Sequence, residues 1–112
     1  MNLHSSPFEK IKSGEKTIEL RLCDEKRQLI KVGDIITFTN TTTFEILNAK
    51  VIKLHKFADF EELYESLPLL KCGYTVDDID GASPSDMNIY YSLEKQKKYG
   101  VLGIEILVER KN

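Results

Sequence analysis

The charged side chains of Lys16, Glu19 and Arg21 are the strongest candidates for chemistry in this sequence. They lie in the segment Gly14–Arg21, which reads Gly-Glu-Lys-Thr-Ile-Glu-Leu-Arg. On a strand, Thr17, Glu19 and Arg21 share one face, with Glu19 and Arg21 about 6–7 Å apart along the chain. Lys16 and Arg21 can hold a phosphate or a base edge through charge-assisted hydrogen bonds. The segment therefore predicts a polar binding site, in which Glu19 orients Arg21 or accepts a hydrogen bond from an exocyclic amine.

Two other interpretations of these residues remain open. The first is an ion pair on a solvated strand face, worth about 0–1 kcal/mol. The second is a catalytic site without metal, in which Glu19 acts as general base on a water and Lys16 steadies the developing oxyanion. Flanking cations lower the pKa of a carboxyl group, which makes it a weaker base near neutral pH. We therefore favour binding over catalysis.

Tyrosine side chains near the C-terminus could complete a site for nucleic acid. Tyr90, Tyr91 or Tyr99 could stack on a base, as aromatic side chains do when they bind single-stranded RNA. Packing of the same rings in the core is the ordinary alternative. Two adjacent tyrosines on a helix cannot both face the core, so we expect either Tyr90 or Tyr91 near the cleft or at the surface. The start of the first predicted helix, at Ser5 and Ser6, is a further candidate for phosphate binding.

The elements that position these side chains follow from capping signals and apolar periodicity. In the first predicted helix, of about eight residues, Ser6 caps and Glu9 completes a capping box, Phe8 and Ile11 face inward, and Gly14 ends the helix. Alternation places Ile18, Leu20 and Leu22 on the apolar face of the next strand. The other predicted elements are a strand beginning near Leu3, strands at 35–39, 44–55 and 101–109, a helix capped by Asp59, and one helix that starts at Ser83 and ends before Gly100.

This order of elements predicts an α+β fold. Short strands without regularly alternating helices argue against a doubly wound parallel sheet. We expect a small mixed or antiparallel β-barrel with helices packed against its openings. The length of 112 residues is close to the commonest size of one domain, so a single domain over 1–112 is expected.

Composition narrows the class of protein further. The chain has a net charge of −2, yet residues 59–86 contain eight acidic side chains and one basic side chain. Segment 59–86 is expected to be a solvated excursion, with an acidic docking face for a protein partner as the alternative, while the basic remainder could attract phosphate. The chain lacks about 20 consecutive apolar residues and a signal peptide, so we expect a cytoplasmic protein without membrane contact. Cys23 and Cys72 are expected to be free thiols, and no cofactor or metal site is predicted.

The ordered motifs resemble those of a known family, the ASCH domain. The resemblance rests on the run Phe8–Arg21, with a helix followed by Gly-x-Lys-x-x-Glu-x-Arg on a strand. It continues through Asp24-Glu25-Lys26-Arg27, through Lys31-Val32-Gly33-Asp34 with Ile36 and Phe38, and through Tyr90-Tyr91 and Tyr99-Gly100-Val101-Leu102-Gly103-Ile104-Glu105. It covers essentially the whole chain. The resemblance implies a β-barrel related to the PUA domain, with the signature residues lining a cleft.

The resemblance also implies a role in RNA binding, although some members are enzymes. One bacterial branch hydrolyses N4-acetylcytidine, and another member is described as a ribonuclease. Lys16 matches the signature lysine of the hydrolytic branch, which has its threonine nucleophile three residues later. That position is Glu19 here, and Thr17 lies elsewhere in the pattern. Glu94 is the candidate for the acidic partner of that branch. The resemblance therefore predicts an RNA-binding or nucleotide-binding protein, with hydrolysis as the alternative.

Overall fold

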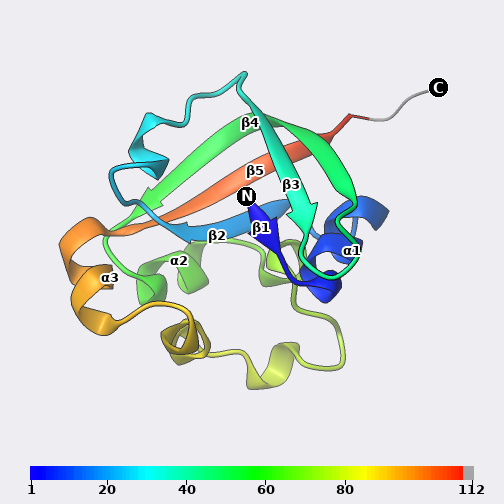
Figure 1. The fold of residues 1–112 in the computed structure, drawn as a ribbon. Coiled ribbons are helices and arrows are strands. Elements are labelled where there is room, and N and C mark those ends of the chain that lie inside the picture. The colour runs from blue at the N-terminus through cyan, green and yellow to red at the C-terminus, as the bar shows by residue number, and fades with distance from the viewer. Residues whose placement is uncertain (110–112) are drawn as a thin grey trace.

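The structure is a computed structural model, and it describes residues 1–109. Five strands form one mixed sheet in the order β1-β3-β4-β5-β2. The strands are β1 Asn2–Leu3, β2 Ile18–Leu22, β3 Ile35–Asn40, β4 Ile46–Phe57 and β5 Val101–Val108, and the helices are α1 Ser5–Ser13, α2 Phe60–Ser66 and α3 Leu93–Tyr99. This arrangement confirms the predicted α+β class, with helices packed against a curled sheet (Figure 1).

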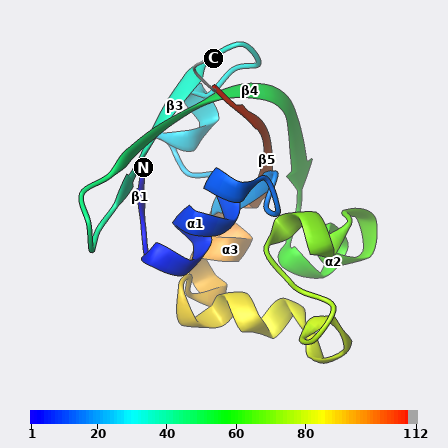
Figure 2. The same cartoon turned by 90° about the vertical axis from the view of Figure 1, so that its right-hand side faces the viewer.

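The sheet curls until its two edge strands approach each other. β1 pairs with β3 in parallel, while the pairs β3–β4, β4–β5 and β5–β2 are antiparallel. A register shift between Val51 and Lys53 interrupts the β4–β5 ladder, and such bulges increase local twist and bending. The edges are joined at one point by a side chain, since Arg21 Nη2 of β2 donates to the carbonyl of Asn2 in β1 at 3.2 Å. The sheet is thus a partly open barrel (Figure 2).

Apolar side chains fill two cores on opposite faces of the sheet. The core inside the curl contains Phe8 and Ile11 of α1, together with Phe38, Val51 and Ile104 of the sheet, all fully buried. The second core lies between β2 and α2, where the apolar face of β2 packs against the buried residues of the helix, Phe60 and Leu63. The predicted alternation of β2 is therefore confirmed. Its apolar face meets α2, and its polar face turns toward the inside of the curl.

The start of α1 differs from the prediction. The N-cap is His4, which makes no capping bond through its side chain, and not Ser6. Ser5 Oγ instead donates to Asn40 Oδ1 at 3.1 Å. An earlier start is possible because the missing N–H of Pro7 then falls in the first turn, where helix N–H groups have no partner within the helix. The end of α1 is as predicted, since Gly14 adopts a left-handed conformation with φ 88°.

The predicted helix between Ser83 and Gly100 is broken in two. A short 3-10 turn, η4 Pro84–Ile89, is followed by α3, whose N-cap Ser92 accepts a hydrogen bond from the N–H of Lys95. A second capping serine gives the chain a local alternative to continued helix. The prediction of one helix was therefore wrong, whereas its start at Ser83 and its end at Gly100 are confirmed. The break leaves Tyr90 and Tyr91 in the connection between the two pieces.

Within residues 1–109 no helix has the length and apolar character needed to cross a bilayer.

Candidate functional site

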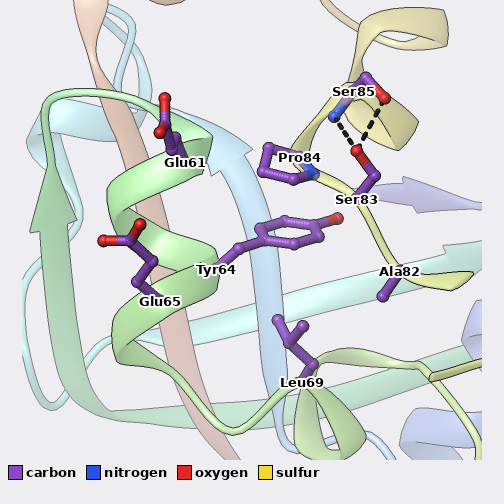
Figure 3. A pocket seen from close by; sticks show the side chains of 8 residues that line it. All are labelled: Glu61, Tyr64, Glu65, Leu69, Ala82, Ser83, Pro84 and Ser85. Atoms are coloured by element: carbon purple, nitrogen blue, oxygen red, sulfur yellow. Dashed lines mark hydrogen bonds between the residues drawn. The ribbon is translucent and has the colours of Figure 1, made fainter. Parts of the chain in front are cut away.

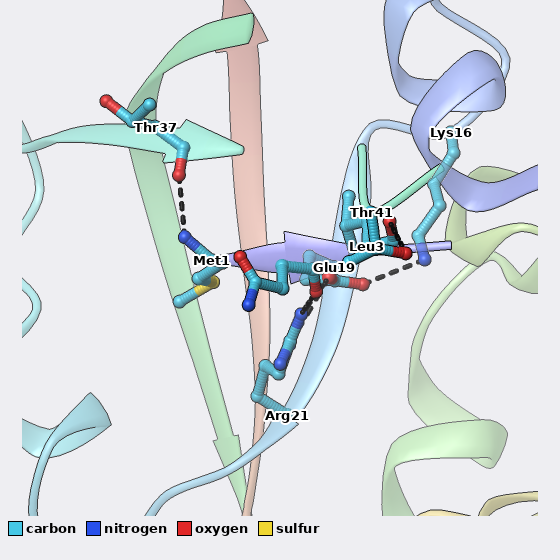
Figure 4. Close-up of polar contacts among 8 residues, drawn as sticks. Met1, Leu3, Lys16, Glu19, Arg21, Thr37 and Thr41 are labelled. Carbon is cyan, nitrogen blue, oxygen red and sulfur yellow. Dashed lines mark hydrogen bonds and ion pairs between the residues drawn. The ribbon is translucent and has the colours of Figure 1, made fainter. Parts of the chain in front are cut away.

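A buried ion cluster forms where β2 faces the open seam of the sheet (Figure 4). Glu19 is 3% exposed. Its Oε1 accepts from Lys16 Nζ at 2.8 Å, and its Oε2 accepts from Arg21 Nη2 at 3.0 Å and Nε at 3.3 Å. The sequence interpretation as a solvated surface pair is therefore wrong. The inward turn of the polar face explains the burial, because Glu19 pairs with the fully buried Ile104 across the ladder and shares its face.

Lys16 is held by the loop that crosses it. The N–H of Lys16 donates to the carbonyl of Lys10 at the end of α1, at 3.0 Å. On the other side, a side chain at Gly73 would come within 3.4 Å of the Lys16 stem, and the φ of Gly73 is +115°. The Gly73 carbonyl accepts from Lys10 Nζ at 2.8 Å. Glycine at position 73 therefore allows the loop to close over Lys16 in a conformation that other residues rarely adopt.

The electrostatics of Glu19 favour a fixed carboxylate. Burial by itself would raise the pKa of Glu19, but the charges of Lys16 and Arg21 and the hydrogen bonds from both side chains outweigh it and hold the pKa below its usual value. Both carboxylate oxygens are occupied by these cations. Such a group orients its neighbours, and it is poorly suited to remove a proton from water near neutral pH.

The ion cluster lies in the wall of a cavity of about 860 Å³. One wall is formed by β1, the start of α1 and β2, and it includes His4 and Ser6. The other wall comes from the irregular chain between α2 and α3. The charged residues that line the cavity are Lys10, Lys16, Arg21, Glu19, Asp78 and Asp86. The lining thus contains three cations and three carboxylates, and this balance suits a ligand group without net charge.

A chain of hydrogen bonds holds the second wall together. Tyr64 and Tyr74 share a hydrogen bond between their hydroxyls at 2.7 Å, and the Tyr74 hydroxyl donates to Asp86 Oδ2, also at 2.7 Å. Burial and these partners raise the pKa of Tyr74, so its hydroxyl stays protonated. All three residues line the cavity. The expectation that 59–86 is only a solvated excursion was therefore wrong, because residues of this segment form one wall of the cavity.

The two candidate tyrosines reach the cavity in different ways. Tyr91 stacks on Phe60, with ring centroids 6.1 Å apart, and packs against the second core. Tyr90 is 63% exposed, and both rings line the cavity. Thus Tyr91 is anchored by its packing, whereas the ring of Tyr90 is exposed to a ligand.

Other candidates lie away from the cavity lining. Thr17 is half-buried, and its N–H donates to the Lys71 carbonyl at 2.8 Å, so its backbone fastens β2 to the second wall. Glu94 is exposed in the first turn of α3. Tyr99 donates to Glu25 Oε1 at 3.2 Å. The described residues that line the cavity do not include Thr17, Glu94 or Tyr99.

A second, smaller hollow lies between α2 and the chain around Pro84 (Figure 3). Its volume is about 520 Å³. Glu61 and Glu65 lie one helical turn apart on its α2 side, with Tyr64 at its centre and Ser83 and Pro84 opposite. This surface belongs to the acidic segment 59–86.

The cysteines and histidines form no evident metal centre. Cys23 and Cys72 are free and buried. Burial raises the pKa of Cys72 to about 11. His55 Nε2 lies 3.1 Å from Glu105 Oε1, on the ladder between β4 and β5. Within residues 1–109, no group of three or more His, Cys, Asp or Glu side chains is placed to hold a metal ion.

Comparison with known proteins assigns the family. The ASCH domain model matches residues 1–110. The crystal structure of the hypothetical protein PH0355 has a TM-score of 0.80 and 36% identity, over 97% of this chain and 96% of that one. The solution structure of protein PF0455 from Pyrococcus furiosus has a TM-score of 0.73 and 33% identity, over 99% of this chain and 100% of that one.

A more distant structure supports the fold alone. The crystal structure of ASCH from Zymomonas mobilis has a TM-score of 0.55 and 16% identity, over 96% of this chain and 64% of that one. A search of proteins with curated functions finds no match. The family match over residues 1–110 leads to one conclusion: the chain belongs to the ASCH domain family.

Proposed function

We propose that this protein binds RNA or a nucleotide in the cavity between β2 and the chain from η2 (Leu69–Cys72) to Tyr91. The observation that carries the proposal is the buried cluster of Lys16, Glu19 and Arg21 in the cavity wall. A buried ion cluster is costly to desolvate and is weak support for stability alone. Membership of the ASCH domain family supports the same proposal, since RNA binding is the role generally considered for this family.

The cavity offers the contacts that an unstacked base requires. Tyr90 is exposed at the lining and can stack on a base, while Tyr91 is held by Phe60 and supplies a fixed surface. Base–aromatic stacking tolerates different bases, because every base has a π face. Glu19 keeps the donors of Lys16 and Arg21 in place, and the remaining donors of these side chains can reach the edge of a base.

Hydrolysis is less well supported by the same geometry. The carboxylate of Glu19 stands where the hydrolytic branch would have its threonine, and both of its oxygens accept hydrogen bonds from cations. Its lowered pKa makes it a weak base. Glu94, the other catalytic candidate, is exposed in the first turn of α3. We therefore propose that Glu19 orients the binding groups.

Calorimetric titration with short single-stranded RNAs and with nucleosides tests this proposal. We expect Tyr90→Ala to weaken binding by about 1–3 kcal/mol, the usual cost of losing one stacked base. Phe44→Ala is the matched control, because Phe44 is also an exposed aromatic residue, at 76%, and lies in the turn between β3 and β4. Equal affinity of wild type and Tyr90→Ala for every ligand that binds would contradict the proposed stacking. No affinity for any of them at low salt would contradict the function.

Product analysis separates binding from turnover. Folded protein is incubated with an acylated cytidine and with RNA, and the mixtures are analysed by chromatography. Recovery of unchanged ligand is expected. Product that forms with wild type and disappears with Glu19→Gln would support the hydrolytic alternative instead.

Two finer expectations remain proposals. We expect basic side chains of a protein partner to bind the acidic segment 59–86 at the hollow beside Glu61 and Glu65, because neither carboxylate makes an ion pair within residues 1–109. Charge reversal of both residues should abolish this interaction and leave nucleoside binding unchanged.

A cytoplasmic location, where RNA and a reducing environment for two free thiols are both available, fits this function.

A further inference from the structure

The charged side chains that line the cavity are divided unequally between its two walls. The wall of β1, α1 and β2 contributes three cations and one carboxylate, from Lys10, Lys16, Arg21 and Glu19. The opposite wall contributes the carboxylates of Asp78 and Asp86, and among the described residues of its lining there is no cation. The lining is therefore neutral as a whole, but it is positive on one side and negative on the other.

The positive wall keeps hydrogen-bond donors for a ligand (Figure 4). Lys16 Nζ uses one of its three N–H groups, toward Glu19 Oε1. Arg21 donates from Nε and Nη2, to Glu19 and to the Asn2 carbonyl, while its Nη1 has no partner within residues 1–109. Lysine and arginine side chains have no acceptor atoms. This wall therefore requires ligand atoms that accept hydrogen bonds.

The negative wall keeps free acceptors. Asp86 Oδ2 accepts from the Tyr74 hydroxyl and from the N–H of Ser83, and these hydrogen bonds lower the pKa of Asp86, so its carboxylate stays ionised. Asp78 Oδ1 accepts from the N–H of Thr75. The other oxygen of each carboxylate, Asp78 Oδ2 and Asp86 Oδ1, accepts no hydrogen bond in the part of the chain that the structure describes. An ionised carboxylate only accepts, so this wall requires ligand atoms that donate.

We propose that the cavity selects guanine, whose N1–H and 2-amino group donate to Asp78 and Asp86 while its O6 and N7 accept from the cations of the β2 wall. The inference rests on the proposed function, because it names the base that this same site prefers. Guanine has two neighbouring donor groups on one side of its ring system and the acceptors O6 and N7 on another. Its pattern therefore matches both walls, and the base carries no net charge.

The other three bases match the divided lining less well. Adenine and cytosine have a single exocyclic amine with an accepting ring nitrogen beside it, and uracil has a single ring N–H between two carbonyl groups. Each of these bases would leave one aspartate without a donor or turn a lone pair toward it. A site with polar groups that are left unpaired discriminates against such a ligand. Stacking on Tyr90 tolerates every base, so the contacts at the base edges set the preference.

The test compares six mononucleotides, each titrated into the isotopically labelled chain and followed by NMR. They are the four ribonucleoside 5′-monophosphates, inosine 5′-monophosphate, which lacks the 2-amino group, and 7-deazaguanosine 5′-monophosphate, which lacks N7. All six carry the same phosphate, so differences between them report on the base. Short oligouridines that contain one guanine or one hypoxanthine repeat the comparison in RNA.

Guanosine monophosphate is expected to bind about tenfold more tightly than each of the other five, as the loss of a hydrogen bond to a charged group predicts. Asp78→Asn keeps an oxygen for the N–H of Thr75 and replaces the free oxygen by a donor. We expect it to raise the dissociation constant of guanosine monophosphate about tenfold. Asp77→Asn is the matched control, because it removes the same charge from an adjacent exposed residue outside the cavity lining, and it should leave this constant unchanged.

The outcomes separate this inference from the proposed function. If the six mononucleotides shift the cavity signals with equal affinity, or if inosine monophosphate binds as tightly as guanosine monophosphate, selection of guanine is overturned and binding in the cavity stands. Equal weakening by Asp78→Asn and Asp77→Asn would also overturn it. If neither the mononucleotides nor the oligouridines shift the cavity signals, the proposed function fails and the inference fails with it. The comparison of ligands on the wild-type chain does not depend on the folding of any variant.

Discussion

The two walls of the cavity are built in different ways. The β2 wall is a regular strand paired along its length with β5, and its charged side chains are fixed in a buried cluster. The opposite wall, from η2 to Tyr91, consists of 3-10 turns and irregular chain, and side-chain hydrogen bonds such as that of Tyr74 to Asp86 hold it. The sheet therefore holds the charged groups of the site in fixed positions. The shape of the cavity, in contrast, depends on a few side-chain hydrogen bonds in the irregular wall.

The largest expected effect comes from removing the central charge of the rigid wall. Glu19→Leu leaves Lys16 and Arg21 without their counter-charge in a buried position, and we expect a loss of about 3–5 kcal/mol in the free energy of unfolding. Urea denaturation measures it. Glu45→Gln is the control, since Glu45 pairs with Lys12 at the surface, and it should cost about 0–1 kcal/mol. Similar losses of unfolding free energy in the two variants would show that burial does not make the Glu19 cluster more important for stability than the surface pair of Glu45 and Lys12.

A smaller effect is expected from removing the hydrogen bonds of Tyr74, which hold the irregular wall. Tyr74→Phe removes the hydroxyl shared with Tyr64 and Asp86, at a cost of about 1–2 kcal/mol. Hydrogen exchange should speed up in residues 74–91 and stay unchanged in the β2–β5 ladder. Tyr99→Phe, which removes a hydroxyl bonded to Glu25 outside the cavity, serves as the control. Uniform acceleration over the whole chain would mean that the two walls do not open separately.

The smallest effect is the dependence of stability on pH. Because the folded state lowers the pKa of Glu19 below its ordinary value, the unfolded state binds the proton first as pH falls. The contribution of Glu19 is therefore present above about pH 4.5 and is lost as pH falls through the folded pKa. Thermal melting of wild type and Glu19→Gln over this acid range checks the sign. A difference that grows as pH falls would contradict it.

The same comparison explains how much the sequence could predict. Strict alternation in Ile18–Leu22 and the Gly14 stop gave the right strand and the right face, and the family resemblance gave the right family. Alternation of apolar and polar residues does not show which face of a strand meets solvent. The burial of Glu19 follows from the curl of the whole sheet, which the sequence of one strand does not reveal. The second wall was missed because its 3-10 turns follow no period, and contacts such as Tyr74 with Asp86 depend on tertiary structure. The predicted helix between Ser83 and Gly100 was wrong because Ser92 is a second capping residue, at which a new helix, α3, begins.

Mapping of ligand contacts by NMR tests the central claim most directly. A short single-stranded RNA or a nucleoside that binds is titrated into the labelled protein, and amide shifts are assigned. We expect shifts on both walls at once, at Glu19 and Arg21 and at Tyr74 and Tyr91. No shift is expected at exposed residues of β3 and β4 away from the cavity lining, such as Thr37 and Lys50. Shifts confined to exposed residues of β3 and β4, with both walls unchanged at saturation, would contradict binding in the cavity.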